Sequence, residues 1–144
     1  MQDEVKDLPG REDIQYWAAL LDGEGTVTVF IQGDEYIRPK VGISSSTLPV
    51  LEEFMSIFGG CIVTKKRYNL KHKPAYTAWL DGKKNCEPFL RQVLPYLKIK
   101  KAQAELVLMI IDNMGKPGKV ISIEDKVFRF KILEKIREVN KRGA

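Results

Sequence analysis

The stretch Trp17-Ala-Ala-Leu-Leu-Asp-Gly-Glu-Gly25 decides how this chain folds. It ends an amphipathic segment, Glu12 to Asp22, whose apolar spacing predicts a helix. The residues that follow it alternate between apolar and polar, which predicts a strand. Ala18 and Ala19 are small residues in the predicted helix, so another backbone can approach this helix closely. The stretch therefore predicts a junction between a closely packed helix and a strand.

The end of this stretch combines glycines with carboxylates. Gly23 and Gly25 allow the chain to leave a helix abruptly, because glycine tolerates positive φ. Asp22 and Glu24 lie at the predicted helix C-terminus, which already carries partial negative charge. Carboxylates there are unfavourable unless a cation is bound, so this junction is a candidate cation site. A helix end terminated by glycine, with no further role, is the alternative interpretation.

Downstream of this junction, two hairpins alternate with helices. The segment Thr26 to Ser44 reads as an antiparallel hairpin that turns at Gly33-Asp34, and Leu48 to Phe58 reads as a helix. The remaining expected elements are strands at Cys61–Tyr68 and Ala75–Leu80 and helices at Asn85–Leu94, Ile99–Asn113 and Ile123–Asn140. The order α-ββ-α-ββ-α-α-α predicts an α+β fold, a curved four-stranded antiparallel sheet backed by helices. We expect residues 1–144 to form a single domain.

One face of the predicted sheet is rich in hydrogen-bonding, cationic and aromatic side chains. Its expected members are Thr26, Thr28, Phe30, Gln32, Tyr36, Arg38, Lys40, Thr64, Lys66, Tyr68, Thr77 and Trp79. Such a face suits insertion of a β-ribbon into the major groove of DNA. The alternative is a half-exposed sheet with an ordinary polar exterior.

The net charge of +5 is unevenly distributed over the 144 residues. Residues 60–101 contain eleven basic and two acidic side chains, whereas residues 1–24 contain seven acidic ones. A basic field confined to one segment favours a polyanion as partner, and a solvated lysine-rich surface is the alternative. A single histidine, His72, and two cysteines exclude a site with two imidazoles and a four-ligand zinc site.

The junction stretch resembles the LAGLIDADG motif of homing endonucleases. Leu20, Asp22 and Gly25 match the motif, while Trp17, Ala19, Leu21, Gly23 and Glu24 replace its first leucine, first glycine, isoleucine, second alanine and second acid. The segment Leu94-Pro-Tyr-Leu-Lys-Ile-Lys-Lys-Ala-Gln-Ala104 also looks like the start of a family helix. The resemblance covers about Gln15–Leu108, and the chain contains no second copy of the motif.

The resemblance implies a homodimer whose motif helices pack along a two-fold axis. We expect the interface to include Trp17, Ala18 and Leu21, with Asp22 in a mainly structural, capping role. Ala19 would lie in the same interface. Two copies of Glu24 would then converge over the DNA.

The resemblance also implies the catalytic residues. Glu24 would be the catalytic acid and, with Gly23, a ligand of Mg²⁺, in a site that Mn²⁺ or Ca²⁺ can also occupy. Lys100 would stabilise charge in the transition state, with Lys98 as its rival or as a phosphate contact, and Ser45 would occupy a polar pocket position.

The leading hypothesis is therefore a metal-dependent, site-specific endonuclease that cuts both strands of a long, pseudo-palindromic double-stranded DNA and leaves short 3′ overhangs. The alternatives on the same fold are an RNA-splicing maturase that binds its intron RNA and a DNA-binding protein that does not cleave. No apolar run reaches the length of a membrane span, and the acidic N-terminal residues are unlike a targeting peptide. We therefore expect an intracellular location, in the cytoplasm, on the nucleoid or in an organelle.

Overall fold

The computed structural model describes residues 11–33, 36–65, 71, 73–114 and 121–143, and the side chains of residues 13–141 within these ranges. Its elements are α1 (Arg11–Glu24), β1 (Gly25–Gln32), β2 (Tyr36–Ser45), α2 (Leu48–Phe58), β3 (Cys61–Thr64), β4 (Tyr76–Asp81), α3 (Gly82–Val93), the short 3₁₀ helix η1 (Leu94–Tyr96), α4 (Lys101–Asn113) and α5 (Ile123–Gly143). The expected α+β order is confirmed. The first helix is longer than expected, because it continues through Gly23 to Glu24.

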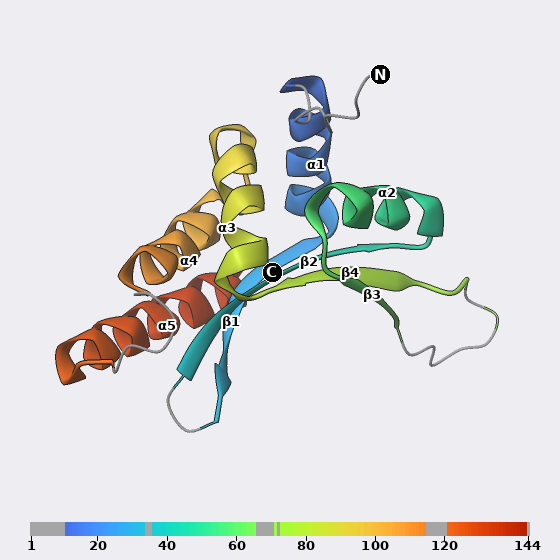
Figure 1. Cartoon of the computed structure of the whole chain (residues 1–144). Coiled ribbons are helices and arrows are strands. Elements are labelled where there is room, and N and C mark those ends of the chain that lie inside the picture. Colours follow the sequence, from blue (N-terminus) through green and yellow to red (C-terminus); the bar gives the residue numbers. More distant parts are fainter. Residues whose placement is uncertain (1–10, 34–35, 66–70, 72, 115–120, 144) are drawn as a thin grey trace, which may run out of the picture.

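The sheet is antiparallel and has the strand order β1-β2-β4-β3. The two hairpins therefore join through β2 and β4, which pair from Lys40 opposite Asp81 to Ser45 opposite Tyr76. The helices cover one face of this curved sheet, with α1, α2 and α3 above it and α4 and α5 beyond β1 (Figure 1). None of the helices formed by the described residues lies on the opposite face, which we call the outer face.

The hydrophobic core lies between the sheet and the helices. Helix α1 contributes Ile14, Trp17, Ala18 and Leu21, which are at most 5% exposed and recur with helical spacing. The sheet contributes residues of period two, such as Val27 and Val29. The Trp17 ring packs edge-on against Phe54 of α2, with ring centroids 5.3 Å apart. This packing holds the motif helix firmly against the rest of the chain.

The strand register shows which side chains share the outer face. Thr26 and Trp79 flank Gly42, and Thr28 and Asp81 flank Lys40. By the same alternation, the side chains of Phe30, Gln32, Tyr36 and Arg38 in the first hairpin also lie on the outer face. The expected outer-face residues of the first hairpin are therefore confirmed to lie on one face.

The expected outer face of the second hairpin is wrong in part. Thr64 pairs with Tyr76, so it lies on the helix-covered side of the sheet, next in alternation to Ile62. Thr77 lies on the outer face but is only 4% exposed, and its hydroxyl forms a 2.9 Å hydrogen bond with the Ser44 hydroxyl. Both are corrections to the predicted contact surface. Lys66 and Tyr68 lie outside the described residues.

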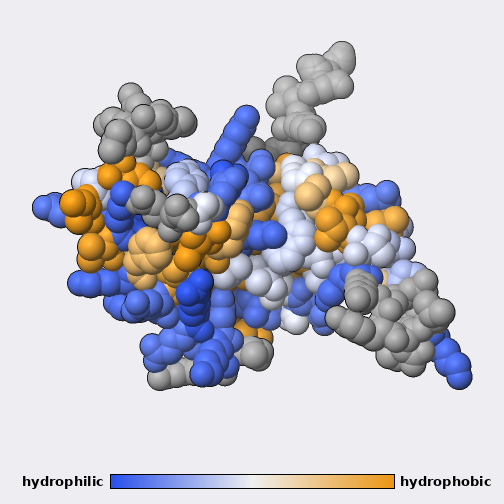
Figure 2. All heavy atoms as spheres, turned by 90° about the horizontal axis from the view of Figure 1, so that it is seen from below, coloured by the Kyte–Doolittle hydropathy of each residue, from blue (hydrophilic) through white to orange (hydrophobic). Residues whose placement is uncertain are grey.

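The view from below shows this side of the molecule in space-filling form (Figure 2). Pale residues separate two groups of apolar residues in this view, a broad one on the side of α4 and α5 and a smaller one on the other side. Large exposed apolar side chains on those helices are Met109, Ile123 and Val127. Within the described residues, every helix is too short or too polar to cross a membrane.

Candidate active site at the junction of α1 and β1

Glu24 is the last residue of α1 and is exposed at the point where β1 begins. The next residue must be glycine, because a Cβ at position 25 would lie 2.5 Å from the Leu21 carbonyl oxygen and 2.4 Å from its Cδ1. The close approach of β1 to the last turn of α1 thus explains the glycine that ends the motif. The same close contact fixes the position of the Glu24 backbone, from which the carboxylate side chain extends.

Asp22 joins α1 to the segment that precedes α4. Its carboxylate accepts hydrogen bonds from the backbone N–H groups of Lys98 (2.8 Å), Ile99 (3.1 Å) and Lys100 (3.0 Å). Three donors on one carboxylate form a tight, charge-assisted anchor. The expected capping role of Asp22 corresponds to this anchor, but its partners lie within the same chain.

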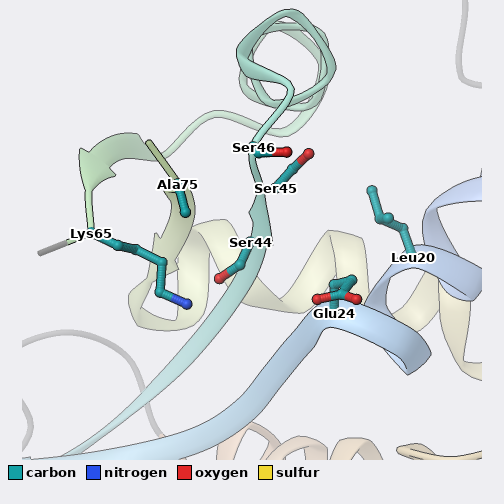
Figure 3. Close-up of a pocket in the computed structure, with 7 residues that line it drawn as sticks. All are labelled: Leu20, Glu24, Ser44, Ser45, Ser46, Lys65 and Ala75. Carbon is teal, nitrogen blue, oxygen red and sulfur yellow. The ribbon is translucent and has the colours of Figure 1, made fainter. Parts of the chain in front are cut away.

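A pocket of about 330 Å³ opens beside this junction. It is lined by Leu20, Glu24, Ser44, Ser45, Ser46, Lys65 and Ala75, contributed by α1, by the end of β2 and by the two chain segments beyond β3 and before β4. Figure 3 shows Glu24 on one side of Ser44 and the Lys65 side chain reaching toward Ser44 from the other side. A carboxylate, an ammonium group and three hydroxyls therefore surround one open space.

The turn after β2 helps to shape this pocket. The Ser45 hydroxyl oxygen accepts a 2.9 Å hydrogen bond from the Thr47 N–H, and Thr47 directly precedes α2. This local bond competes with extended pairing and turns the chain out of the sheet at the pocket rim. Ser45 is therefore placed in the pocket with Glu24, as a residue of that turn.

The described residues offer few carboxylate ligands for a metal ion. Among the described residues, no group of three or more His, Cys, Asp or Glu side chains could hold an ion. Glu24 takes part in none of the ion pairs that the described residues form. Mg²⁺ is commonly held by one or two carboxylates together with water and substrate phosphates. Glu24 and the adjoining helix end at Gly23 fit such a site, with one carboxylate per chain.

Charges on the outer face are already engaged near its centre. Arg38 Nε donates a 3.1 Å hydrogen bond to Asp81 Oδ1 in an ion pair. The Lys40 ammonium lies 4.4 Å from the centroid of the Trp79 ring and 5.5 Å from that of Phe30, within the range of cation–π contacts. The two predicted cationic contacts of the first hairpin, Arg38 and Lys40, thus already have partners within the sheet.

The backbones of Lys98 and Lys100, the two lysines predicted to act at the site, contact the end of α1. Asp22 holds the N–H groups of Lys98 and Lys100, and Asp22 precedes Glu24 by two residues. The side chains of these lysines are not among those that line the pocket. The structure therefore brings Glu24 and Ser45 together in the pocket, whereas it holds Lys98 and Lys100 at Asp22 through their backbone N–H groups.

The expected dimer interface needs a correction. Trp17, Ala18 and Leu21 are at most 1% exposed and pack inside this chain, so they are not available to a partner. The exposed side of α1 instead carries Tyr16, Ala19 and Gly23. Asp22 is half-buried by its anchor to the segment before α4.

Sequence reasoning missed Lys65, Ser44 and Ser46 as pocket residues. The sequence contains no clear signal for Lys65, because Ile62 and Val63 are both apolar and only the pairing with β4 puts residues 61, 63 and 65 on the outer face. The Lys65 N–H donates a 2.8 Å hydrogen bond to the Ala75 carbonyl, which continues the pairing of β3 with β4. Nothing in the sequence indicated that the two hairpins meet through β2 and β4.

Two comparisons based on sequence, with models of protein families and with curated proteins, find no match. Solved structures do match. The homing endonuclease I-CvuI in complex with its target has a TM-score of 0.70 and 21% identity, over 90% of this chain and 82% of that one. The archaeal intron-encoded homing endonuclease I-Vdi141I, complexed with DNA, has a TM-score of 0.71 and 18% identity, over 88% of this chain and 82% of that one.

A third match is the LAGLIDADG homing endonuclease I-GzeII in complex with its DNA target. The TM-score is 0.65 at 20% identity, over 86% of this chain but only 43% of that one. The present chain thus corresponds to less than half of that longer protein and to most of I-CvuI. With its α-ββ-α-ββ-α-α-α order, its open antiparallel sheet and its motif helix at the site, the chain has the fold of the LAGLIDADG homing endonucleases.

Proposed function

We propose that this chain is one subunit of a homodimeric, metal-dependent and site-specific DNA endonuclease. The observation that carries the proposal is the position of Glu24. It projects from the end of the motif helix into a pocket with Ser45, without an ion-pair partner among the described residues. Solved proteins of the same fold hold DNA.

The outer face supports double-stranded DNA as the substrate. It combines Arg38 and Lys40 with hydrogen-bonding side chains such as Thr26, Thr28 and Gln32 along one hairpin. A two-stranded ribbon of this kind fits the major groove, where donors and acceptors distinguish the base pairs. The pocket lies on the same side, at the other end of β2, so bound DNA would bring a phosphodiester to Glu24.

Glu24 and Gly23 would hold the divalent ion, with the second carboxylate supplied by a second copy of the chain. When bound, Mg²⁺ lowers the pKa of water and neutralises charge on the phosphodiester. Glu24 would hold the ion in this site, and the Ser45 hydroxyl would donate to a phosphate oxygen or to water. The Asp22 anchor holds the segment of Lys98 and Lys100 beside the same junction, where both ammonium groups add positive potential.

The homodimer would form through the exposed side of α1. Tyr16, Ala19 and Gly23 follow the i, i+3, i+7 spacing of one helix face, and the two small residues permit close approach of a second helix. Such a dimer would place two Glu24 carboxylates near its axis.

The decisive experiment is a cleavage selection on a randomised duplex library with Mg²⁺, run with the wild type, Glu24→Gln and Glu134→Gln. Glu134 is an exposed carboxylate on α5, outside the pocket, and serves as the matched control. We expect the wild type and Glu134→Gln to enrich cut duplexes and Glu24→Gln to bind the same duplex in Ca²⁺ without cutting it. Equal cleavage by Glu24→Gln would refute the catalytic assignment.

The alternatives predict other outcomes of the same experiment. A wild type that retains duplex DNA but never cuts it would be a non-cleaving DNA-binding protein. Preference for a folded intron RNA over every duplex, measured by competition, would indicate a maturase.

A further inference from the structure

Lys65 and Glu24 occupy two walls of one pocket although they are far apart in the sequence. Lys65 follows β3 and continues its pairing through the bond from its N–H to Ala75. Alternation along this edge puts Lys65 on the outer face, with Val63 opposite Thr77 one step earlier. Figure 3 shows its side chain extending into the pocket toward Ser44.

These two opposite charges do not neutralise each other. Ion pairs among the described residues, counted up to 4.0 Å, join Arg38 to Asp81 and Arg91 to Glu87 and Asp112. Lys65 and Glu24 take part in none of them. A cation and a carboxylate that face one open space without meeting leave room for a group that attracts both, such as a phosphodiester accompanied by a divalent cation.

Lys65 also differs from the other described cations of the outer face. Arg38 is engaged by Asp81, and Lys40 lies over the rings of Trp79 and Phe30. The Lys65 ammonium has neither an acidic nor an aromatic partner among the described contacts. It can therefore bind an anion without first giving up an internal interaction.

The third wall of the pocket supplies further donors for an anion. Ser44, Ser45 and Ser46 line it, and α2 begins two residues later at Leu48. The Thr47 side chain makes no capping hydrogen bond to α2. The Ser44 hydroxyl is bonded to Thr77, whereas the Ser45 and Ser46 hydroxyls can donate to phosphate oxygens that the single Lys65 ammonium does not reach.

We infer that Lys65 is a catalytic residue that contacts the scissile phosphodiester opposite Glu24. The inference rests on the proposed nuclease function. In the hydrolysis, the oxygen of water bonds to phosphorus and the P–O3′ bond breaks, with its electron pair leaving on O3′. The water gives up a proton to solvent and O3′ takes one from solvent. Lys65 offsets the negative charge that grows on the phosphoryl oxygens during this step.

The test uses Lys65→Met, Lys65→Arg and a matched control, Lys73→Met. Lys73 is an exposed lysine of the same basic segment that does not line the pocket. Single-turnover cleavage is measured with saturating protein, Mg²⁺ and the duplex recovered by selection, and affinity is measured by anisotropy in Ca²⁺. We expect Lys65→Met to cut about 10²-fold more slowly, as when one transition-state donor is removed. Affinity should fall by less than about tenfold, since one phosphate contact is lost of many.

Lys65→Arg should recover most of the rate, because it keeps the positive charge. Lys73→Met should cut at the wild-type rate. If Lys65→Met cuts as fast as Lys73→Met, the inference is wrong although the proposed function stands.

A second readout does not depend on cleavage. Neutral methylphosphonate replaces each central phosphate of the duplex in turn, and affinity is measured for the wild type and Lys65→Met. If Lys65 contacts a phosphate directly, replacement of that one phosphate should lower the affinity of the wild type but not the affinity of Lys65→Met. Additive losses at every position would overturn the contact. If the wild type cuts no duplex, the proposed function fails, and this cycle on a duplex recovered by binding still decides whether Lys65 touches a phosphate.

Discussion

The anchor made by Asp22 predicts a large loss of stability when its carboxylate is removed. Asp22→Ala leaves the N–H groups of Lys98, Ile99 and Lys100 without their acceptor. Hydrogen bonds to charged groups contribute about 1.5–3 kcal/mol each, and water can solvate part of this exposed segment. Taking about 1 kcal/mol for each of the three bonds, we expect the free energy of unfolding to fall by roughly 3 kcal/mol.

Asp22→Asn provides an internal check on this reasoning. The bonds from Ile99 and Lys100 both end on Oδ1, whereas the bond from Lys98 ends on Oδ2. An amide keeps one acceptor oxygen and turns its NH₂ group toward the Lys98 N–H, so we expect a loss of about half that of alanine.

The assay is urea unfolding at neutral pH, with the midpoint shift converted at constant m. Asp13→Ala is the control, because Asp13 is an exposed acid of the same helix, and surface substitutions usually change stability by less than about 0.5 kcal/mol. The reasoning is refuted if Asp22→Ala and Asp13→Ala unfold at the same urea concentration.

Three further predictions concern packing, the interface and the thiols. Gly42→Ala would place a Cβ 2.5 Å from two carbons of the Trp79 ring, so urea unfolding should show a loss of about 1–3 kcal/mol, with a changed near-UV signal as the ring is displaced. An unchanged near-UV spectrum would contradict the close contact. Ala19→Arg should convert a dimer to a monomer in sedimentation velocity at micromolar concentration without changing the far-UV spectrum, and a monomeric wild type, free and with DNA, would refute the homodimer. Burial raises the pKa of Cys86 from 9.0 to about 12, so the native protein should react with one equivalent of a thiol reagent at pH 8, at the exposed Cys61, and with two after denaturation. The protonated Cys86 thiol stabilises the folded state below pH 9, and this stabilisation is lost as the pH rises toward 12. The free energy of unfolding of Cys86→Ala should therefore fall less steeply than that of the wild type between pH 9 and pH 12. Rapid reaction of both thiols in the native protein would contradict the burial of Cys86.

Most elements could be predicted because their periodicity is local. The first hairpin has Val27, Val29, Val41 and Ile43 on one face, and only one strand register buries all four. The helix Leu48–Phe58 was predicted with its observed bounds, because proline near its start and two glycines after its end mark both termini. In these segments the sequence and the tertiary structure favour the same conformation.

The errors arose where both faces of an element look alike in sequence. In the short edge strand β3, both Ile62 and Val63 are apolar, and only the pairing with β4 decides that Thr64 lies on the helix-covered side and Lys65 lines the pocket. In α1 the neighbouring alanines, Ala18 and Ala19, fall on opposite sides of the buried boundary.

The partners of Asp22 could not be read from the sequence either. They lie 76 to 78 residues further along the chain and are backbone groups, which carry no residue signature. The negative end of the helix dipole disfavours an acid at this position, and only the fold shows the three N–H donors that stabilise Asp22.

The paired charges of the outer face have a consequence for how it discriminates between partners. Because Asp81 lies against Arg38, this part of the sheet offers an acceptor beside a donor, and Lys40 is held over aromatic rings. A duplex that contacts Arg38 or Lys40 would exchange these internal interactions for contacts with DNA, so these two cations would add little net attraction. The number of counterions released would then be smaller than the number of cations in the sequence, so that the base edges rather than the total charge would select the site.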